Sequence, residues 1–335
     1  MGNAYILVSV IILVALIFDY TNGFHDAANA IATSIATKAM RARTALFVAA
    51  FGNLIGAFIS EGVAKTVGKG IIDVEPSNAG LYTVLAALLG AIAWNLFTWW
   101  FGIPSSSSHA LIGGLVGAAL ASQELVHWDG VVAKVAIPMV LSPMIGFTLA
   151  YSLALALQWI FRNAKRSHTG KGFRAGQVVS ATAMSVGHGL QDAQKTMGVM
   201  TLALVVGGFH SGESIPNWVK VSAALAISLG TYAGGWRIMK TLGKRMVEID
   251  PVRGLASQTV ASGVLYVLAI GYQAPISTTH TITSSILGAG STRGRKFVKW
   301  NVVGSILTAW VITLPAAGLC AGSCFYLFRF LGLVG

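Results

Sequence analysis

Two carboxylates interrupt apolar sequence at matching places. Asp26 lies in Gly-Phe-His-Asp-Ala-Ala-Asn, and Asp192 lies in Gly-Leu-Gln-Asp-Ala-Gln-Lys, 166 residues further along the chain. A charged side chain in an apolar segment is costly and indicates a function. Carboxylate and amide oxygens suit a small cation, so we predict a site for Na⁺ or H⁺ formed by Asp26, Asp192, Asn29 and Gln191. The flanking glycines favour helix-opening positions for both carboxylates, and capping of a helix is the structural alternative.

Runs of hydroxyl side chains follow a proline in two places. Pro104 is followed directly by four serines. Pro275 is followed by Ile276 and then by three hydroxyl residues. Proline and Ser/Thr favour the first turn of a helix, where unpaired N–H groups and the positive end of the dipole attract anions. We predict an oxyanion site with these ligands: Ser105, Ser106, Ser107, Ser108, Ser277, Thr278, Thr279, Asn29 and Lys195. The alternative, that the hydroxyls bond to carbonyl groups one turn back or join helices, is disfavoured by the duplication.

Histidines complete both hydroxyl motifs. His109 and His280 occupy equivalent positions, where they would relay protons, donate to the anion, or bond to a neighbouring carbonyl group. His25 and His188 flank the carboxylates out of register with each other and therefore carry less weight. Two helix dipoles and Lys195 attract an anion that the two carboxylates repel. A cation bound between them would offset this repulsion, which favours cation-coupled transport of a small oxyanion.

The segments that carry these residues are those of a membrane protein. Of 335 residues, 55% are hydrophobic and 10% are charged, whereas soluble proteins carry about 25% charged residues. This composition predicts an all-α polytopic membrane protein and excludes a soluble enzyme. A complete span needs about 20 apolar residues. The shorter segments 24–37, 105–121 and 276–290 are therefore expected to be half-helices or arms of re-entrant hairpins.

Three motif pairs recur in the same order: Asp26 and Asp192 at an offset of 166 residues, Lys65–Lys69 and Lys240–Lys244 at 175, and Pro104–His109 and Pro275–His280 at 171. They predict an N-terminal repeat over 1–161, a basic linker over 162–175 and a C-terminal repeat over 176–335. The loops 38–43, 162–174, 237–253 and 291–299 hold 17 of the 23 Lys and Arg residues, whereas 122–130 and 207–216 contain none. The positive-inside rule makes the linker cytoplasmic. Loop 38–43 is basic whereas its repeat-equivalent loop 207–216 is not, and loop 291–299 is basic whereas its equivalent 122–130 is not. The two halves are therefore expected to have inverted topology. The net charge of +12 then reports orientation rather than a nucleic-acid partner.

Other function classes lack their signatures. The sequence contains no Gly-x-Ser-x-Gly elbow, no His-Glu-x-x-His motif and no phosphate-binding loop, so neither hydrolase chemistry nor an ATP-driven pump is indicated, and no cofactor or structural metal is expected. A passive anion channel stays open as an alternative, although the buried carboxylate pair disfavours it.

The duplicated motifs resemble those of the inorganic phosphate transporter (PiT) family of phosphate permeases. The stretch Asn22–Ala30 is similar to the family's Gly-x-x-Asp-x-x-Asn signature, Gly189–Thr196 resembles its second copy, and the Pro-hydroxyl-His motifs at 104–109 and 275–280 also fit. The resemblance covers nearly the whole chain. It implies about ten to twelve helices in inverted repeats, a homodimer in the lipid of the cytoplasmic membrane, and symport of inorganic phosphate, free or as a metal complex, with Na⁺ or H⁺. Sulfate or another oxyanion is the alternative substrate.

Overall fold

The chain is a bundle of helices. The computed structural model describes residues 2–164 and 166–334. The first half contains α1 (Gly2–Ala36), α2 (Ala42–Gly56), α3 (Gly62–Lys69), β1 (Ile72–Asp73), α4 (Asn78–Phe101), α5 (Ser107–Ser122), β2 (Leu125–Val126), α6 (Trp128–Val131), η1 (Val132–Ala136) and α7 (Ile137–Ile160). The second half contains α8 (Arg166–Val206), α9 (Asn217–Ala233), α10 (Trp236–Lys240), η2 (Thr241–Arg245), α11 (Pro251–Tyr266), η3 (Val267–Gly271), α12 (Thr278–Ser291), η4 (Arg295–Phe297) and α13 (Trp300–Phe330). The strands β1 and β2 form a small antiparallel sheet in which Ile72 pairs with Val126.

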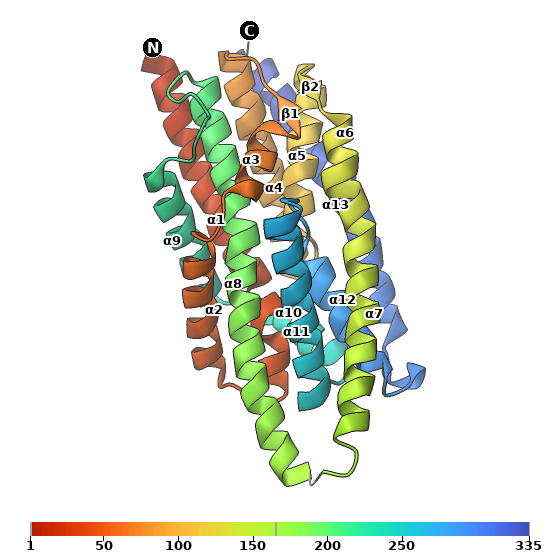
Figure 1. The fold of residues 1–335 in the computed structure, drawn as a ribbon. Coiled ribbons are helices and arrows are strands. Elements are labelled where there is room, and N and C mark those ends of the chain that lie inside the picture. The colour runs from red at the N-terminus through yellow and green to blue at the C-terminus, as the bar shows by residue number, and fades with distance from the viewer. Residues whose placement is uncertain (1, 165, 335) are drawn as a thin grey trace.

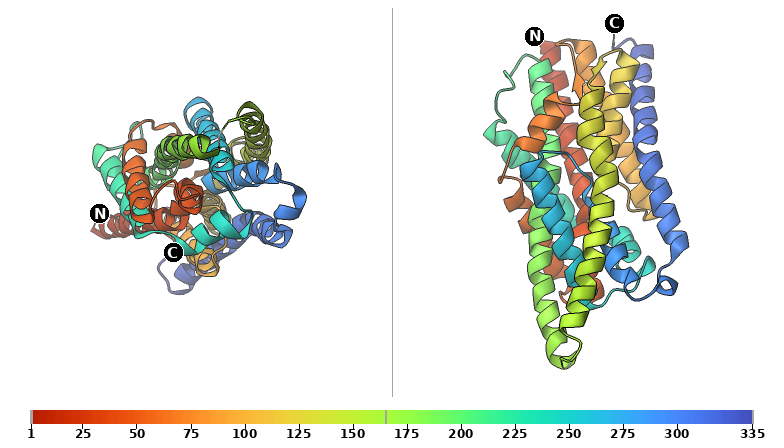
Figure 2. Two further views of the ribbon diagram at one scale, coloured as in Figure 1. Left: turned by 90° about the horizontal axis from the view of Figure 1, so that it is seen from below. Right: turned by 45° about the vertical axis from the view of Figure 1, so that its right-hand side comes forward.

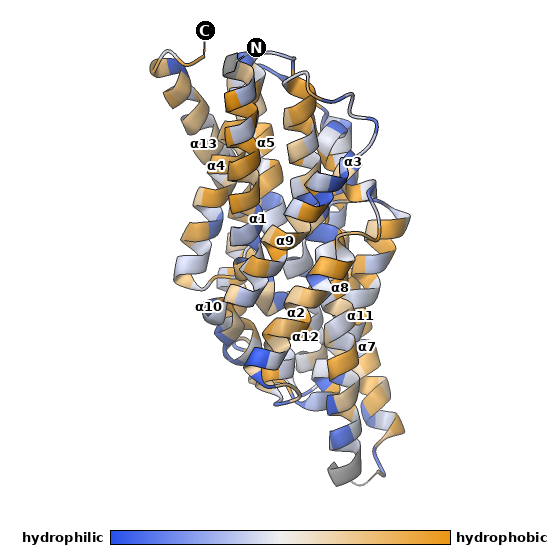
Figure 3. Ribbon diagram, turned by 90° about the vertical axis from the view of Figure 1, so that its left-hand side faces the viewer, coloured by the Kyte–Doolittle hydropathy of each residue, from blue (hydrophilic) through white to orange (hydrophobic). Residues whose placement is uncertain are grey.

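The bundle presents an apolar surface suited to lipid. Within the described chain, five helical segments are long and apolar enough to cross a membrane: Ala4–Ala36, Asn78–Phe101, Trp128–Ile160, Pro251–Gly271 and Trp300–Phe330. Large apolar side chains point outward from them, as Leu319 does with 74% of its surface exposed. Figure 3 shows orange, hydrophobic ribbon along the outer helices and blue, hydrophilic ribbon gathered toward loops and ends. These features confirm an all-α, multi-pass membrane protein.

Two long helices, α1 and α8, run in opposite directions through the bundle (Figure 1). The helix α1 packs against α4, α8 and α9, and α8 packs against α2, α3 and α11. The end-on view in Figure 2 shows the other helices gathered around this pair. Because α1 and α8 contact each other along their length, polar residues on their facing sides are enclosed by protein.

The three segments that the sequence predicts to be half-helices differ in how well the structure agrees with the prediction. The segments 105–121 and 276–290 form α5 and α12, each entered from non-helical backbone at 103–106 or 273–277, as predicted. The prediction of a half-helix over 24–37 is wrong, because α1 continues unbroken through this region. The glycines that suggested a break are packing contacts. A Cβ atom at Gly23 would lie 2.8 Å from the Thr231 nitrogen of α9, and one at Gly189 would lie 2.7 Å from the Asn53 carbonyl carbon of α2.

The helix contacts follow the pattern expected of a duplicated chain. The helix α1 packs on α9 while α8 packs on α2, and α5 packs on α13 while α12 packs on α7. In Figure 1, the basic loops that join α1 to α2, α7 to α8 and α12 to α13 lie at the end opposite the two termini. This exchange of partners supports the inverted repeats over 1–161 and 176–335, which stay a prediction together with the cytoplasmic placement of the linker.

Candidate binding site

The predicted polar residues meet where the middle of α1 and α8 faces the first turns of α5 and α12. The side chains of Asp26 and Asp192 are 1% and 0% exposed. Both lie inside unbroken helices, so the predicted helix-opening positions are wrong, and so is the capping alternative. The carboxylates are instead held by hydroxyl groups of α5 and α12 together with polar side chains of their own helices.

Asp26 is surrounded by three polar groups. Its Oδ2 accepts a hydrogen bond of 2.7 Å from the Ser107 hydroxyl of α5, and its Oδ1 accepts one of 3.2 Å from the Thr279 hydroxyl of α12. The Nδ1 atom of the adjacent His25 lies 2.7 Å from Oδ1. These contacts leave the carboxylate solvated by protein dipoles without a fixed ammonium or guanidinium partner among the described ion pairs.

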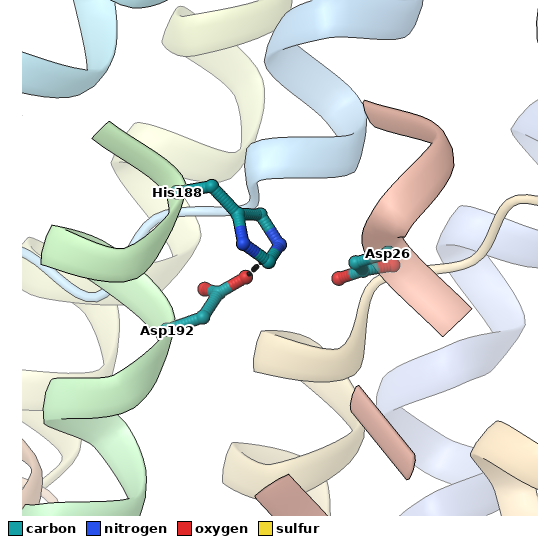
Figure 4. A group of neighbouring side chains, drawn as sticks. All are labelled: Asp26, His188 and Asp192. Atoms are coloured by element: carbon teal, nitrogen blue, oxygen red, sulfur yellow. Dashed lines mark ion pairs between the residues drawn. The ribbon is translucent and has the colours of Figure 1, made fainter. Parts of the chain in front are cut away.

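Asp192 has a fixed positive partner. The Lys195 ammonium, one helical turn later on α8, forms an ion pair with Oδ1. Oδ2 accepts a hydrogen bond of 3.2 Å from the Thr278 hydroxyl and lies 2.9 Å from His188 Nε2. Figure 4 shows the His188 ring beside Asp192, on the side that faces Asp26. The two carboxylates therefore differ in charge environment although the sequence pairs them.

Three of these groups are close enough together to share one cation. Ligand atoms of Asp26, His188 and Asp192 all lie within 4.8 Å of one another, and all three residues are buried. Oxygen ligands suit Na⁺, whereas a proton needs only one of the carboxylates or a ring nitrogen. The arrangement can therefore hold the coupling ion that the sequence predicts.

The hydroxyl residues divide into two groups. The Ser106 and Ser277 side chains cap α5 and α12 by accepting 3.1 Å hydrogen bonds from the His109 and His280 N–H groups. Ser105 donates to the Thr98 hydroxyl over 2.7 Å, outside the carboxylate pair. By contrast, the remaining hydroxyls contact the charged residues of α1 and α8: Ser107, Ser108, Thr278 and Thr279. The two helix N-termini are therefore aimed at the carboxylates.

The amide residues and the lysine have separate partners. Asn29 Nδ2 donates to Thr278 and Thr279 over 3.3 and 2.9 Å. Gln191 Nε2 donates over 3.1 Å to the Ala274 carbonyl oxygen in the segment leading to α12. The Lys195 ammonium donates to Asp192, to the Ser108 hydroxyl and to the Ile276 carbonyl oxygen, which uses its three protons.

His109 and His280 lie next to each other. Their ring centroids are 4.6 Å apart in an edge-to-face arrangement, and the His280 ring stacks on Trp310 at 3.8 Å. Among the described residues, three ring nitrogens of this pair make no hydrogen bond: His109 Nδ1, His280 Nδ1 and His280 Nε2. The alternative in which these atoms bond to nearby carbonyl groups is therefore not observed, and the relay prediction is untested.

Sequence reasoning gave too little weight to three ionisable residues. His25 and His188 each contact a carboxylate, although their spacing from it differs between the halves. Asp19 is fully buried on α1, two turns before Asp26, with Thr196, Asp192 and Lys195 of α8 as its polar neighbours. Its position in a long apolar run was the available signal, but no second-half carboxylate matches it, because residue 185 is a serine.

Comparison with known proteins identifies the family of this chain. Residues 22–321 match the model of the phosphate transporter family. The chain belongs to this family. It is 43% identical over 325 residues to a probable low-affinity inorganic phosphate transporter of Bacillus subtilis (strain 168), covering 96% of this chain and 97% of the relative. A protein of Rhizobium meliloti (strain 1021) with the same description is 46% identical over 328 residues, covering 96% and 97% of the two chains.

A solved structure described as the sodium-dependent phosphate transporter has the same fold. It superposes with a TM-score of 0.83 at 21% identity, covering 97% of this chain and 99% of that chain. Membership of the phosphate transporter family confirms the resemblance found in the sequence and makes this chain a multi-pass transporter, not an enzyme.

Proposed function

We propose that this family member imports inorganic phosphate across the cytoplasmic membrane by symport with Na⁺ or H⁺. The observation that carries the proposal is the meeting of two helix N-termini with two buried carboxylates. Hydroxyls at the start of α5 and α12 donate to Asp26 and Asp192. Helix N-termini attract a phosphate oxyanion, but two carboxylates would repel it in the absence of a cation.

The coupling follows from this electrostatic arrangement. A cation that binds beside Asp26 removes the repulsion that the Lys195–Asp192 ion pair does not already offset, so that the hydroxyls turn from the carboxylates to the phosphate oxygens. By linkage, phosphate raises the affinity for the cation by the same factor. Binding of both together is therefore favoured over binding of either alone, which is the requirement for symport.

The test is uptake of radiolabelled phosphate into proteoliposomes, with Na⁺ or a pH gradient imposed separately and a protonophore added in parallel. Dependence on one cation gradient, with accumulation above the external concentration, is the expected result. Equilibration without accumulation would instead indicate a passive channel. Competition by sulfate that equals competition by unlabelled phosphate would favour the broader oxyanion specificity.

Substitution of the carboxylates tests their role. We expect Asp26→Asn and Asp192→Asn each to lower cation-stimulated uptake by about 5–150-fold, which is the factor that corresponds to typical coupling free energies. The neutral amide keeps the shape but loses the charge that attracts the cation. Asp73→Asn, which removes an exposed carboxylate, is the control and should keep normal uptake. Normal cation dependence in both site variants would show that the coupling site lies elsewhere.

A further inference from the structure

The two carboxylate motifs differ at one position that matters for charge. Three residues after Asp26 stands Asn29, and three residues after Asp192 stands Lys195. On a helix this spacing places both residues on the same face as their carboxylate. The first motif is therefore negatively charged, whereas the second is neutral overall.

Both residues nevertheless reach the same place relative to the short helices. Lys195 donates to Ser108, the fourth residue after Pro104. Asn29 donates over 2.9 Å to Thr279, the fourth residue after Pro275. The amide and the ammonium thus occupy equivalent positions in the two motifs.

The surroundings of the Lys195 ammonium are those of a bound cation. Its ligands are a carboxylate oxygen of Asp192, the Ser108 hydroxyl, and the Ile276 carbonyl oxygen at 2.9 Å. The side chain is 2% exposed, so water does not replace these ligands. Carboxylate, hydroxyl and carbonyl oxygens are also the ligands that hard metal cations prefer.

The equivalent place beside Asp26 has the oxygens without the ammonium. Asp26 Oδ1 and the Thr279 hydroxyl are 3.2 Å apart, and Asn29 points its amide nitrogen at Thr279. Asn29 Oδ1 is buried and makes no hydrogen bond with any described group. A buried amide oxygen without a partner is costly, and a cation beside Asp26 would satisfy it.

We propose that Lys195 is a tethered cation that permanently fills the second of two equivalent cation positions, so that an exchangeable cation binds at the first, beside Asp26 and Asn29. The inference rests on the proposed cation-coupled transport. It gives Lys195 a role other than direct phosphate binding. It also means that this chain moves one cation fewer per phosphate than a chain in which both positions are open.

The variant Lys195→Asn tests this directly because it gives the second motif the pattern of the first. In proteoliposomes, the reversal potential of phosphate flux under imposed Na⁺, pH and voltage gradients yields the number of cations moved per phosphate. We expect Lys195→Asn to move one more cation per phosphate than the unmodified protein. Lys220→Gln, which removes a lysine paired with Glu61 outside the site, should keep the original ratio.

A binding measurement decides the question if the variant does not transport. Thermal unfolding in detergent is followed with NaCl or choline chloride at equal ionic strength, and separately with pH. The unmodified protein should be stabilised by Na⁺ or H⁺ through the first position, and Lys195→Asn should gain a second, additional saturable stabilisation, because each ligand that binds the folded state raises its stability. An unchanged ratio in an active variant, or no added cation response in an inactive or unstable one, would overturn the inference. Absence of phosphate uptake by the unmodified protein would instead refute the proposed function.

Discussion

The buried acidic residues of α1 and α8 outnumber the buried ammonium groups. Asp19, Asp26 and Asp192 face the centre of the bundle with a single buried ammonium, that of Lys195, among the described residues. His25 and His188 contact two of the carboxylates, whereas Asp19 takes part in none of the ion pairs among the described residues. Burial of an unpaired carboxylate costs several kcal/mol. Residues that lower stability in this way are retained where they serve a function.

The substitution Asp19→Asn should therefore separate stability from activity. We expect the free energy of unfolding to rise by about 1–3 kcal/mol, because a buried carboxyl group, which is costly to ionise, is replaced by a neutral amide. Phosphate uptake is expected to fall in the same variant. Thermal unfolding in detergent and uptake in proteoliposomes measure the two effects. Asp129→Asn, at an exposed carboxylate of α6, is the control. A variant with lower stability and full uptake would contradict the expectation.

The sequence was informative where a motif occurred twice. The repetition of Asp26 as Asp192, and of Ser107 as Thr278, predicted side chains that the fold brings within hydrogen-bond distance. Asp19 was missed because the same comparison finds Ser185 opposite it. Contacts of His25 and His188 could not be predicted, because each depends on how the helix is rotated against its neighbours rather than on spacing along the chain.

At the scale of elements, the glycines beside the two carboxylates do not mark helix breaks, and the sequence prediction failed there for a physical reason. In a membrane helix glycine marks either a break or a close approach of another backbone, and the sequence alone does not distinguish them. Gly23 and Gly189 lie against backbone atoms of α9 and α2, so α1 and α8 remain continuous. The prolines were interpreted correctly because the hydroxyl cap that follows each one, Ser106 or Ser277, is itself a local signal.

Enlarging Gly23 should separate α1 from α9. We expect Gly23→Val to lower the free energy of unfolding by about 1–3 kcal/mol, since the added carbons meet backbone that cannot move aside. Gly263→Ala is the matched control on α11, because a Cβ atom there has no neighbour within 4 Å. It should raise stability by about 0.5–1 kcal/mol through the higher helix propensity of alanine. Equal melting temperatures for the two variants would refute the packing role of Gly23.

The small sheet offers a test of electrostatics outside the membrane. Partial burial of Glu124 raises the pKa of its carboxyl group, and the carboxylates of Glu75 and Asp73 contribute to the rise. A raised folded-state pKa means that ionisation of Glu124 opposes folding, so its unfavourable effect grows as the pH rises above the usual glutamate range. Glu124→Gln should therefore stabilise the protein at pH 7 and have little effect near pH 4. Thermal unfolding at both pH values is the measurement, and a gain confined to pH 4 would contradict it.

At the scale of the whole molecule, the candidate site is enclosed by protein. The site residues are buried by α1, α8 and the two short helices. Below them, toward the basic loops, Thr37 donates to Gln177 over 2.6 Å, and Gln258 donates to the Ala30 carbonyl oxygen over 2.8 Å. These bonds join the residue that follows α1 to α8, and α1 itself to α11, on that side. Under the proposed transport function, release of phosphate in this direction would require these bonds to separate.

The unbroken course of α8 connects the candidate ion site rigidly to the far end of the helix. Asp192 and the exposed Gly172 lie on the same helix, about 30 Å apart at 1.5 Å per residue. A tilt of about 10° at the site would move the far end of the helix by about 5 Å. A fluorophore at Gly172→Cys, in a chain with Cys320 and Cys324 replaced, should therefore change its emission when phosphate and cation are added together. The same label at Gly263→Cys serves as the comparison. A change in emission at position 172 without a change at position 263 would show that the end of α8 near the basic linker moves when phosphate and cation bind.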